Sequence, residues 1–383
     1  MIPYGRHYVD KNDFKSIKKV LNSNFLTQGP ITKKFEEKIS KFCKVKYSAA
    51  VSSASVALYI SCRALNLKKD DIFWTVPNTY AATANSGFLC GSKVDFVDID
   101  KNTNNICIKS LEKKLLWSKK KNKLPKVLIT VHFAGLPCDQ KNIWKLSKKY
   151  NFKIIEDASH SLGSKNLNNF TGNCKWSDLT VFSFHPVKII TTGEGGMITT
   201  NNRDLNNKIR MLINNGITKN PNLYKNKIKK KWYYEQHDIS LNFRLSDISA
   251  ALGLSQLKKI NSFINKRNKI AKYYNSKLKD LDINLPIVNS KIRSSFHLYV
   301  IKVNPKLRND LFDFLIKNKV DVNMHYLPLH LHPIYKEHNF KKGNFPMSEL
   351  HSKSAISLPI YPSLKKKDMN KTIKLIREFY KKI

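Results

Sequence analysis

Hydrophobic and polar residues follow two different periods between about residues 45 and 200, and the two periods alternate along the chain. Short runs of β-branched and apolar residues indicate buried strands, whereas apolar residues three or four positions apart indicate helices. The predicted strands cover residues 94–99, 126–131, 153–157, 179–183 and 197–200, and the predicted helices cover residues 53–65 and 141–150. This alternation is typical of an α/β fold with a mostly parallel sheet that is covered on both faces and binds ligands at its strand ends.

The pattern changes from about residue 244 onward. We predict one long helix over residues 246–279, a strand over residues 296–303, and helices over residues 307–318 and 367–381. These elements indicate a smaller α+β domain at the carboxyl end. Because 383 residues exceed the usual size of a single core, we expect a large domain over residues 1–250 and a small one over residues 251–383.

The charge is strongly positive, with 69 Lys and Arg against 28 Asp and Glu and a formal net charge of +41. Such a charge favours polyanionic partners. Lysine is nevertheless spread along the whole chain together with abundant Asn and Ile, which indicates a compositional bias rather than a basic patch. The sequence shows no recognisable nucleic-acid-binding motif, so we expect no nucleic-acid partner.

The remaining composition narrows the class of protein further. Hydrophobic residues make up 41% of the chain, enough to bury a core. No stretch approaches the roughly 20 apolar residues of a membrane-spanning helix, and the first residues lack the apolar centre of a signal peptide. We therefore expect a cytoplasmic protein without a membrane partner. The six cysteines form no C-x-x-C pair, so we expect free thiols and no metal site.

Glycine is scarce, with 13 residues in the chain, yet Gly193, Gly195 and Gly196 fall within four positions. This concentration indicates unusual backbone angles or close backbone approach. Lys188 lies between these glycines and the strand predicted at residues 179–183. A lysine in such a turn is a candidate Schiff-base nucleophile, although most lysines in so lysine-rich a chain are solvated surface charges.

Three further segments carry candidate chemistry, each with a purely structural alternative. Asp157, at the end of a predicted strand, could face a cation such as a protonated pyridine nitrogen, or it could cap a helix. Small hydroxyl residues around Ser55 could bind a phosphate at a helix start, or only cap that helix. Tyr80 could stack on a planar ligand or pack in the core. With an amine that captures an aldehyde, this set matches the requirements of pyridoxal phosphate.

Several motifs also occur in the order found in a known family. They are FLTQGP at residues 25–30, VHFAG at 131–135, EDASH at 156–160, FSFHPVKIITTGEGG at 182–196, LNFRLSD at 241–247, HY at 325–326 and SLPIYP at 357–362. On these motifs the chain resembles, nearly end to end, the DegT/DnrJ/EryC1/StrS sugar aminotransferases. The resemblance implies a fold-type-I transferase dependent on pyridoxal 5'-phosphate, assembled as a homodimer with shared active sites.

Carried over by position, the resemblance assigns four residues to the ring of the cofactor. It implies that Lys188 forms the covalent link to the cofactor and acts as the catalytic base and acid. It implies that Asp157 pairs with the pyridine nitrogen and that Tyr80 stacks on the ring. His160 occupies a position beside the ring that holds His or Gln in the family.

The resemblance also assigns residues to the phosphate. Backbone and hydroxyl groups of Ser55 and Val56, together with Ser183, would bind it. Asn242 matches an asparagine that reaches the phosphate of the cofactor in the neighbouring subunit. Ser55 and Val56 stand where the family often has Thr and Ala, which are mild changes.

Within the family, residues 2–6 and the segments around Lys188 resemble the members that aminate C4 of a UDP-linked 4-keto-6-deoxy-N-acetyl hexosamine in pseudaminic acid biosynthesis. The implied partners are this nucleotide-linked keto sugar and glutamate, which leaves as 2-oxoglutarate. His325, His330 and His332 are candidate sugar contacts, and no spacing argument chooses among them.

Alternative functions stay open from the sequence. One is an aminotransferase for a different nucleotide-linked keto sugar, perosamine-like or 4-amino-arabinose-like. Another is a dehydratase on the same fold, but dehydratase relatives replace the lysine with histidine, so Lys188 favours transamination. A third is a binding protein that senses pyridoxal phosphate or a polyanion, which would need an attached DNA-binding region if it acted on DNA.

Overall fold

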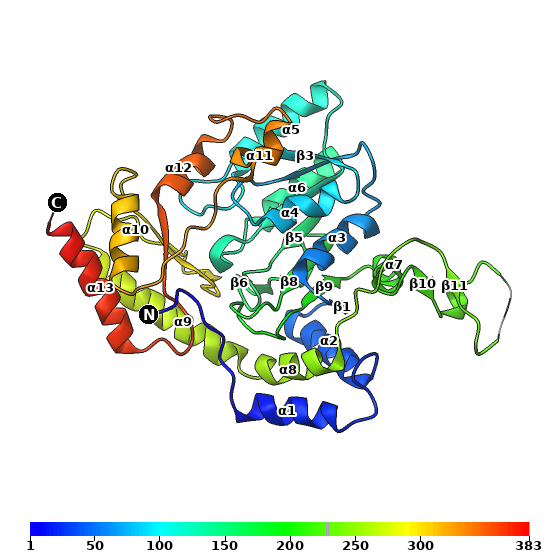
Figure 1. The fold of residues 1–383 in the computed structure, drawn as a ribbon. Helices are drawn as coiled ribbons and strands as arrows, with labels where there is room; N and C mark the ends of the chain where they lie inside the picture. Colours follow the sequence, from blue (N-terminus) through cyan, green and yellow to red (C-terminus); the bar gives the residue numbers. More distant parts are fainter. Residues whose placement is uncertain (227, 229, 383) are drawn as a thin grey trace.

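A seven-stranded sheet lies at the centre of the molecule (Figure 1). The structure is a computed structural model that describes residues 1–226, 228 and 230–382. In spatial order the strands are β1 (Tyr47–Val51), β9 (Gly196–Thr200), β8 (Leu179–Ser183), β5 (Lys153–Asp157), β4 (Val127–Val131), β2 (Ile72–Thr75) and β3 (Lys93–Phe96). β9 runs antiparallel to both neighbours, and the other strands are parallel to one another. The predicted mostly parallel sheet is therefore confirmed. β3 ends at Phe96, three residues before the end of the strand predicted at residues 94–99.

Helices cover both faces of the sheet, because successive side chains of each strand point to opposite sides. Ile129 and Ile155 enter one core with α3 (Ala54–Ala64), α4 (Ala81–Phe88) and α7 (Arg203–Ile213). Leu128 and Ile154 enter the core of the other face with α5 (Ile108–Lys120) and α6 (Gln140–Tyr150). On that same face α2 (Pro30–Cys43) packs over β1, β8 and β9. The result is a three-layer α/β unit with apolar strands buried on both sides.

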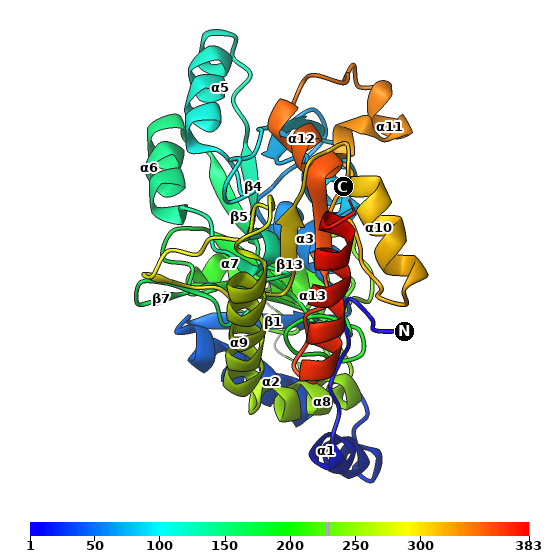
Figure 2. The same cartoon turned by 90° about the vertical axis from the view of Figure 1, so that its left-hand side faces the viewer.

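The C-terminal unit has its own core. Its elements are α9 (Ile260–Leu278), β12 (Ile292–Arg293), β13 (Tyr299–Lys302), α10 (Arg308–Lys317), α11 (Pro333–Lys336), α12 (Pro346–Ser354), β14 (Ala355–Leu358) and α13 (Lys366–Tyr380). β13 and β14 pair antiparallel, and α13 lies between α9 and α10 (Figure 2). The expected α+β character is confirmed.

The predicted single helix over residues 246–279 is wrong, because the structure has two helices there. α8 (Asp247–Leu257) ends before Lys259, whose backbone N–H bonds to Gln256 O and whose ammonium pairs with Asp10 and Asp13. The bend lets α8 pack against α1 (Lys11–Leu21) and α2 while α9 continues to the second core.

The second core also draws on the start of the chain. Ile2 packs in it, and the backbone of Ile2 pairs with that of Val320. Along α9, Phe263 belongs to the core of the large unit and Tyr274 to the second core. One helix thus joins both units, and the division at residues 250 and 251 stays a prediction.

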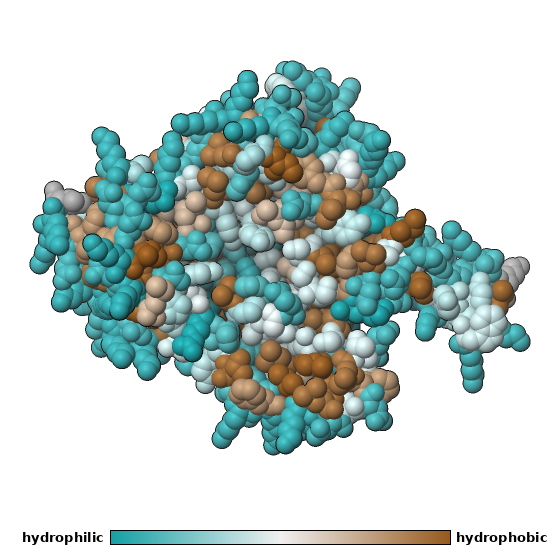
Figure 3. All heavy atoms as spheres, in the orientation of Figure 1, coloured by the Kyte–Doolittle hydropathy of each residue, from teal (hydrophilic) through white to brown (hydrophobic). Residues whose placement is uncertain are grey.

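Smaller elements complete the fold. β6 (Lys165–Asn166) and β7 (Asn169–Phe170) form a small sheet with β12, and short 3₁₀ turns span Phe133–Gly135, Pro221–Leu223 and Leu329–Leu331. β10 (Ile217–Thr218) and β11 (Glu235–Gln236) form an arm that projects from the body (Figure 1). Figure 3 shows hydrophilic side chains over most of the visible face and hydrophobic ones gathered over α8. Among the described residues, no helix is long and apolar enough to cross a membrane.

Candidate active site

A pocket lies at the carboxyl ends of β5 and β8, closed by a loop of the C-terminal unit. Ligands of open parallel sheets bind at this edge, because the connecting loops gather there. The lining residues fall within segments 53–58, 79–83, 157–160, 183–188 and 323–326, with Tyr4, Val131, Glu194 and His297 in addition. The pocket therefore combines distant parts of the chain.

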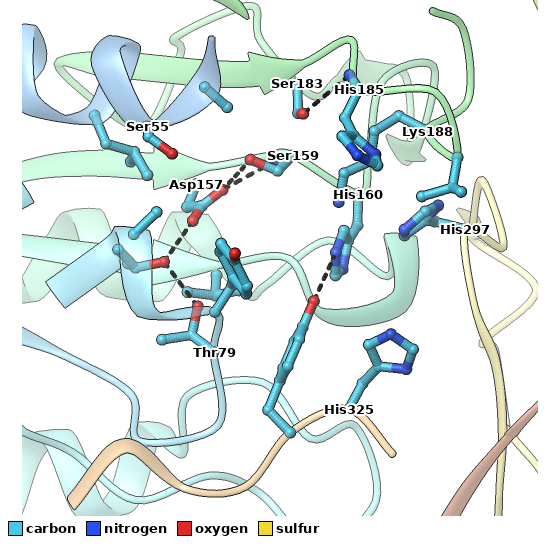
Figure 4. Close-up of a pocket in the computed structure, with 18 of the residues that line it drawn as sticks. Ser55, Thr79, Asp157, Ser159, His160, Ser183, His185, Lys188, His297 and His325 are labelled. Atoms are coloured by element: carbon cyan, nitrogen blue, oxygen red, sulfur yellow. Dashed lines mark hydrogen bonds between the residues drawn. The ribbon is translucent and has the colours of Figure 1, made fainter. Parts of the chain in front are cut away.

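The carboxylate of Asp157 enters the pocket from the last position of β5 and is held by three hydrogen bonds (Figure 4). Thr83 Oγ1 donates to Oδ2 at 2.8 Å, and Ser159 donates to Oδ1 through its hydroxyl at 2.6 Å and its N–H at 3.2 Å. These donors fix the direction of a buried acid. Turns rather than a helix follow Asp157, so the helix-capping alternative is wrong.

Lys188 lies in the turn after β8, where its N–H donates to His185 O. The side chain lines the pocket and is partly buried, so Lys188 is not a solvated surface charge. Burial lowers the pKa of Lys188 to about 8, although the negative charge of Asp157 acts in the opposite direction. At pH 7 about one amine in ten is then unprotonated, far more than for an ordinary lysine. The site thus contains a nucleophilic amine.

The first turn of α3 forms another wall. Ser53 caps this helix by accepting the Val56 N–H at 3.3 Å, while Ser55 is exposed toward the pocket. The capping alternative therefore holds for Ser53, whereas phosphate binding at Ser55 stays a prediction. Ser183, at the end of β8, lines the pocket as well.

The glycine cluster is explained by close backbone approach beside this wall. A Cβ added to Gly196 would come within 2.5 Å of the Ser53 carbonyl oxygen and 2.8 Å of Ala54 N. Gly193 has a φ of +81°, in the left-handed region that favours glycine. Both reasons predicted from the sequence are confirmed.

Tyr80 stands at the start of α4 with 65% of its surface exposed, and it lines the pocket. The alternative that this ring packs in the core is therefore wrong. Its ring centre lies 6.3 Å from that of Tyr326. An exposed ring at a pocket wall can lie against a planar ligand.

Three histidines, His160, His297 and His325, gather on the wall formed with the C-terminal unit. The rings of His160 and His297 lie 4.3 Å apart, and His160 Nε2 shares a 3.2 Å hydrogen bond with the Tyr326 hydroxyl (Figure 4). Burial and repulsion from neighbouring positive groups, Lys188 included, hold the pKa of His160 and His297 well below the ordinary value. The same causes lower the pKa of His325 to about 3. These rings are therefore neutral hydrogen-bonding groups.

Some predicted residues lie outside the pocket. Val56 does not line it, and its N–H already bonds to Ser53. Asn242 is exposed and accepts the Arg244 N–H at 3.3 Å, so any role in a neighbouring subunit stays a prediction. Of the three histidines considered as sugar contacts, His325 lines the pocket, whereas His330 and His332 do not.

Thr83, Ser159, His297 and Tyr326 are among the pocket residues that were not predicted as site residues. Thr83 lies one turn after Tyr80 on the same helix, and Ser159 lies two positions after Asp157, so both had a local signal in their spacing. His297 and Tyr326 reach the pocket from the C-terminal unit, and Tyr326 was noted only as part of a motif. A partly buried amine of lowered pKa in one pocket with a fixed carboxylate is typical of an enzyme that acts covalently on amines or carbonyl compounds.

Comparisons with known proteins agree with this class. A model of the DegT/DnrJ/EryC1/StrS aminotransferase family matches residues 7–377. The chain is 35% identical to the UDP-4-amino-4,6-dideoxy-N-acetyl-beta-L-altrosamine transaminase of Campylobacter jejuni, covering 96% of this chain and 94% of that one. It is 30% identical to the GDP-perosamine synthase of Escherichia coli O157:H7, covering 99% and 98%.

Solved structures extend the likeness to three dimensions. Helicobacter pylori PseC, an aminotransferase involved in the biosynthesis of pseudoaminic acid, gives a TM-score of 0.90 at 30% identity over all of both chains. Spr1654 from Streptococcus pneumoniae in its PLP form gives a TM-score of 0.89 at 26% identity, covering 100% of this chain and 99% of that one.

The chain belongs to the DegT/DnrJ/EryC1/StrS aminotransferase family and is an aminotransferase. The resemblance inferred from its motifs is therefore confirmed. The predicted fold class, the fold-type-I architecture of pyridoxal-phosphate-dependent transferases, is confirmed as well.

Proposed function

We propose that this aminotransferase uses pyridoxal 5'-phosphate to move an amino group from glutamate to C4 of a UDP-linked 4-keto-6-deoxy-N-acetyl hexosamine, as in pseudaminic acid biosynthesis. The observation that carries the proposal is the presence in one pocket of the Lys188 amine and the triply hydrogen-bonded Asp157 carboxylate. The names of the Campylobacter and Helicobacter relatives support the sugar.

The residues present fit the ring of this cofactor. When bound, pyridoxal phosphate supplies an aldehyde and a protonated ring that withdraws electrons. Lys188 would hold it covalently, and Asp157 would pair with the pyridine nitrogen. Tyr80 would cover one face of the ring and His160, whose buried Nδ1 has no partner among the described residues, would lie beside it.

The phosphate would lie at the first turn of α3. Ser55 offers an N–H and a hydroxyl there, and Ser183 offers a second hydroxyl from β8. The positive end of a helix dipole favours an anion at this place. For Val56 to contribute its N–H, the bond to Ser53 Oγ would have to be exchanged for one to the phosphate.

Lys188 would also move the proton on which transamination depends. As a base it would take the proton from the substrate carbon that carries the amine, and as an acid it would deliver it to C4′ of the cofactor. This work requires a neutral amine near pH 7, and the lowered pKa of about 8 supports it. In the second half of the cycle the same residue would act in reverse on the keto sugar, which leads to ping-pong kinetics.

A homodimer with shared active sites is part of the proposal. Large apolar side chains are exposed on α1, just after it, and along the segment that follows the arm, which is unusual for a free surface: Phe14, Leu21, Phe25, Leu26, Ile239 and Leu241. Asn242 lies in the segment that follows the arm, so a partner subunit that covers this region would contact the Asn242 amide. This supports the role in the neighbouring subunit.

A second substrate has a specific observation in its favour. The chain is 30% identical to a GDP-perosamine synthase along nearly its whole length, so a GDP-linked 4-keto-6-deoxy hexose is the alternative. A dehydratase is disfavoured because Lys188 is retained.

The test begins with the purified protein and added pyridoxal phosphate. We expect a visible absorption band that glutamate converts to that of the amine form of the cofactor. Lys188→Ala should lose this conversion, whereas Lys145→Ala, at an exposed position of α6, should keep it. Incubation with UDP-linked and GDP-linked 4-keto sugars, followed by mass spectrometry, identifies the product.

Each outcome has a distinct meaning. Amine on the UDP sugar supports the proposal, and amine only on the GDP sugar replaces its substrate. Loss of sugar oxygen without amine transfer would indicate the dehydratase. Multiple turnovers by Lys188→Ala would overturn the assignment of the nucleophile.

A further inference from the structure

Arg267, on α9, is a buried cation with an unusual set of partners. Only 1% of its surface is exposed, and Nη1 donates to the carbonyl oxygens of Phe296 at 3.2 Å, His297 at 3.1 Å and Ile360 at 2.9 Å. Within the part of the chain that the structure describes, Arg267 forms no ion pair with a carboxylate. Burial lowers the pKa of Arg267 to about 10, so the group stays charged at neutral pH.

Burying a guanidinium without a carboxylate partner costs free energy, so the three carbonyl contacts of Arg267 call for a functional explanation. The three carbonyls belong to two segments that are far apart in sequence and converge on one nitrogen. Arg267 therefore fixes the backbone at His297, just before β13, relative to α9. That backbone directs the His297 side chain.

The imidazole of His297 lines the same pocket as Lys188 (Figure 4). It is 5% exposed, and its Nδ1 has no hydrogen-bond partner among the described residues. Nδ1 is closed off from the pocket, whereas Nε2 forms no hydrogen bond among the described residues and is not closed off in this way, so Nε2 is the nitrogen that a ligand atom would complete.

The electrostatic surroundings define what His297 can offer. The pKa of His297 lies well below the ordinary value because of burial and the nearby His160, Lys188, Arg267 and His325. A neutral imidazole cannot attract a carboxylate by charge, but it can make one directed hydrogen bond to a carbonyl oxygen or an amine.

We propose that His297 contacts the oxygen or nitrogen atom that is exchanged at the reacting carbon, and that Arg267 is the residue that positions it. The inference rests on the proposed function of this pocket. Both substrates present their exchanging atom beside Lys188 in turn, so one residue on this wall serves both half-reactions.

The kinetic test compares His297→Leu with His297→Gln, which keeps a hydrogen-bonding group. His297→Leu should slow both half-reactions by about 10–100-fold in single-turnover measurements, with KM little changed, and His297→Gln should recover part of the loss. His330→Gln is the matched control, because His330 is also buried with an unpartnered Nδ1 but lies outside the pocket. It should behave as the unmodified protein.

Arg267 is tested through its coupling to His297. Arg267→Lys and Arg267→Met should reproduce the fall in rate, and Arg267→Met combined with His297→Leu should be no slower than the slower single variant. If Arg267→Met does not fold, Arg267→Lys carries the same comparison. Multiplied effects in the double variant would overturn the positioning role.

A direct readout that does not depend on turnover is ¹⁵N NMR of histidine-labelled protein loaded with pyridoxal phosphate. Adding α-methylglutamate, which binds but has no proton to lose at Cα, should shift the ring nitrogens of His297, assigned with His297→Gln. An unshifted His297, or His297→Leu at the unmodified rate, overturns the inference. Failure of the unmodified protein to react with glutamate would instead overturn the proposed function.

Discussion

The hydroxyl of Thr83 donates a 2.8 Å hydrogen bond to Oδ2 of Asp157, across 74 residues of sequence. Thr83 itself is held by Thr79, whose hydroxyl lies 2.8 Å from that of Thr83. Helix α4 thus fixes the orientation of an acid at the end of β5. The direction of the carboxylate depends on how a helix packs on the sheet.

Thr83→Val tests the importance of this orientation, because valine keeps the shape and removes the donor. A hydrogen bond to a charged group contributes about 1.5–3 kcal/mol, so we expect the dissociation constant of pyridoxal phosphate to rise by about 10–100-fold. Fluorescence titration of the cofactor-free protein measures it. Thr83→Ser retains the hydroxyl and should bind nearly as the unmodified protein, and equal binding by all three would show that Thr83 is not needed.

The pH dependence of cofactor attachment follows from Lys188. Burial lowers the pKa of this amine to about 8, so the neutral, reactive form dominates above that pH and declines below it. We expect the rate of covalent attachment of pyridoxal phosphate to rise with pH and level off near 8. Stopped-flow absorbance gives this profile.

Asp157→Asn provides the check on the cause. The negative charge of Asp157 raises the pKa of Lys188, so its removal should move the plateau to lower pH. A rate that keeps rising beyond pH 10, as for a solvated lysine, would contradict the lowered pKa.

Subunit complementation tests the shared active site. Lys188→Ala and Asn242→Ala proteins should each be nearly inactive, but a mixed dimer would contain one site with an intact Lys188 and a partner's intact Asn242. Random mixing makes half of the dimers hybrid, so about a quarter of the unmodified activity should return. No recovery in proven heterodimers would place Asn242 outside the neighbouring site.

Gly196→Ala should lower the stability of the protein and disturb the first turn of α3, where the phosphate is proposed to bind. The added Cβ would meet the backbone at Ser53 and Ala54, which cannot move without shifting the start of α3. Overpacking of this kind lowers the free energy of unfolding by about 1–3 kcal/mol, and cofactor affinity should fall with it. Urea unfolding and cofactor titration measure the two effects.

Gly343→Ala is the matched control. Gly343 has a φ of +94° with nothing within 4 Å of an added Cβ, so its substitution strains the backbone without touching the pocket. It should lose roughly 1–2 kcal/mol of stability and bind the cofactor normally. A Gly196→Ala protein with unchanged cofactor affinity would show that Gly196 does not affect phosphate binding at the first turn of α3.

Much of the large unit follows from local pattern. β4, β5, β8 and β9 lie within a residue of their predicted ranges, because strands buried on both faces carry continuous apolar runs. Asp157 and Lys188 are candidates for a related reason, since Asp157 ends a strand that the sequence predicts and Lys188 follows one, while the ordered motifs assign their roles. The assignment to a family came from ordered motifs rather than from periodicity.

The tertiary structure decided what depends on contacts between distant segments. The helical pattern over residues 246–279 does not contain the bend before Lys259, because that bend arises where α8 and α9 pack on different cores. Thr83 reaches Asp157 because α4 packs on the sheet, and the backbone at Phe296 and His297 bonds to Arg267 of a distant helix. The sequence alone determined the strands, because their apolar runs are local, and its ordered motifs singled out Asp157 and Lys188. The partners that orient those groups were determined by packing, which no local pattern encodes.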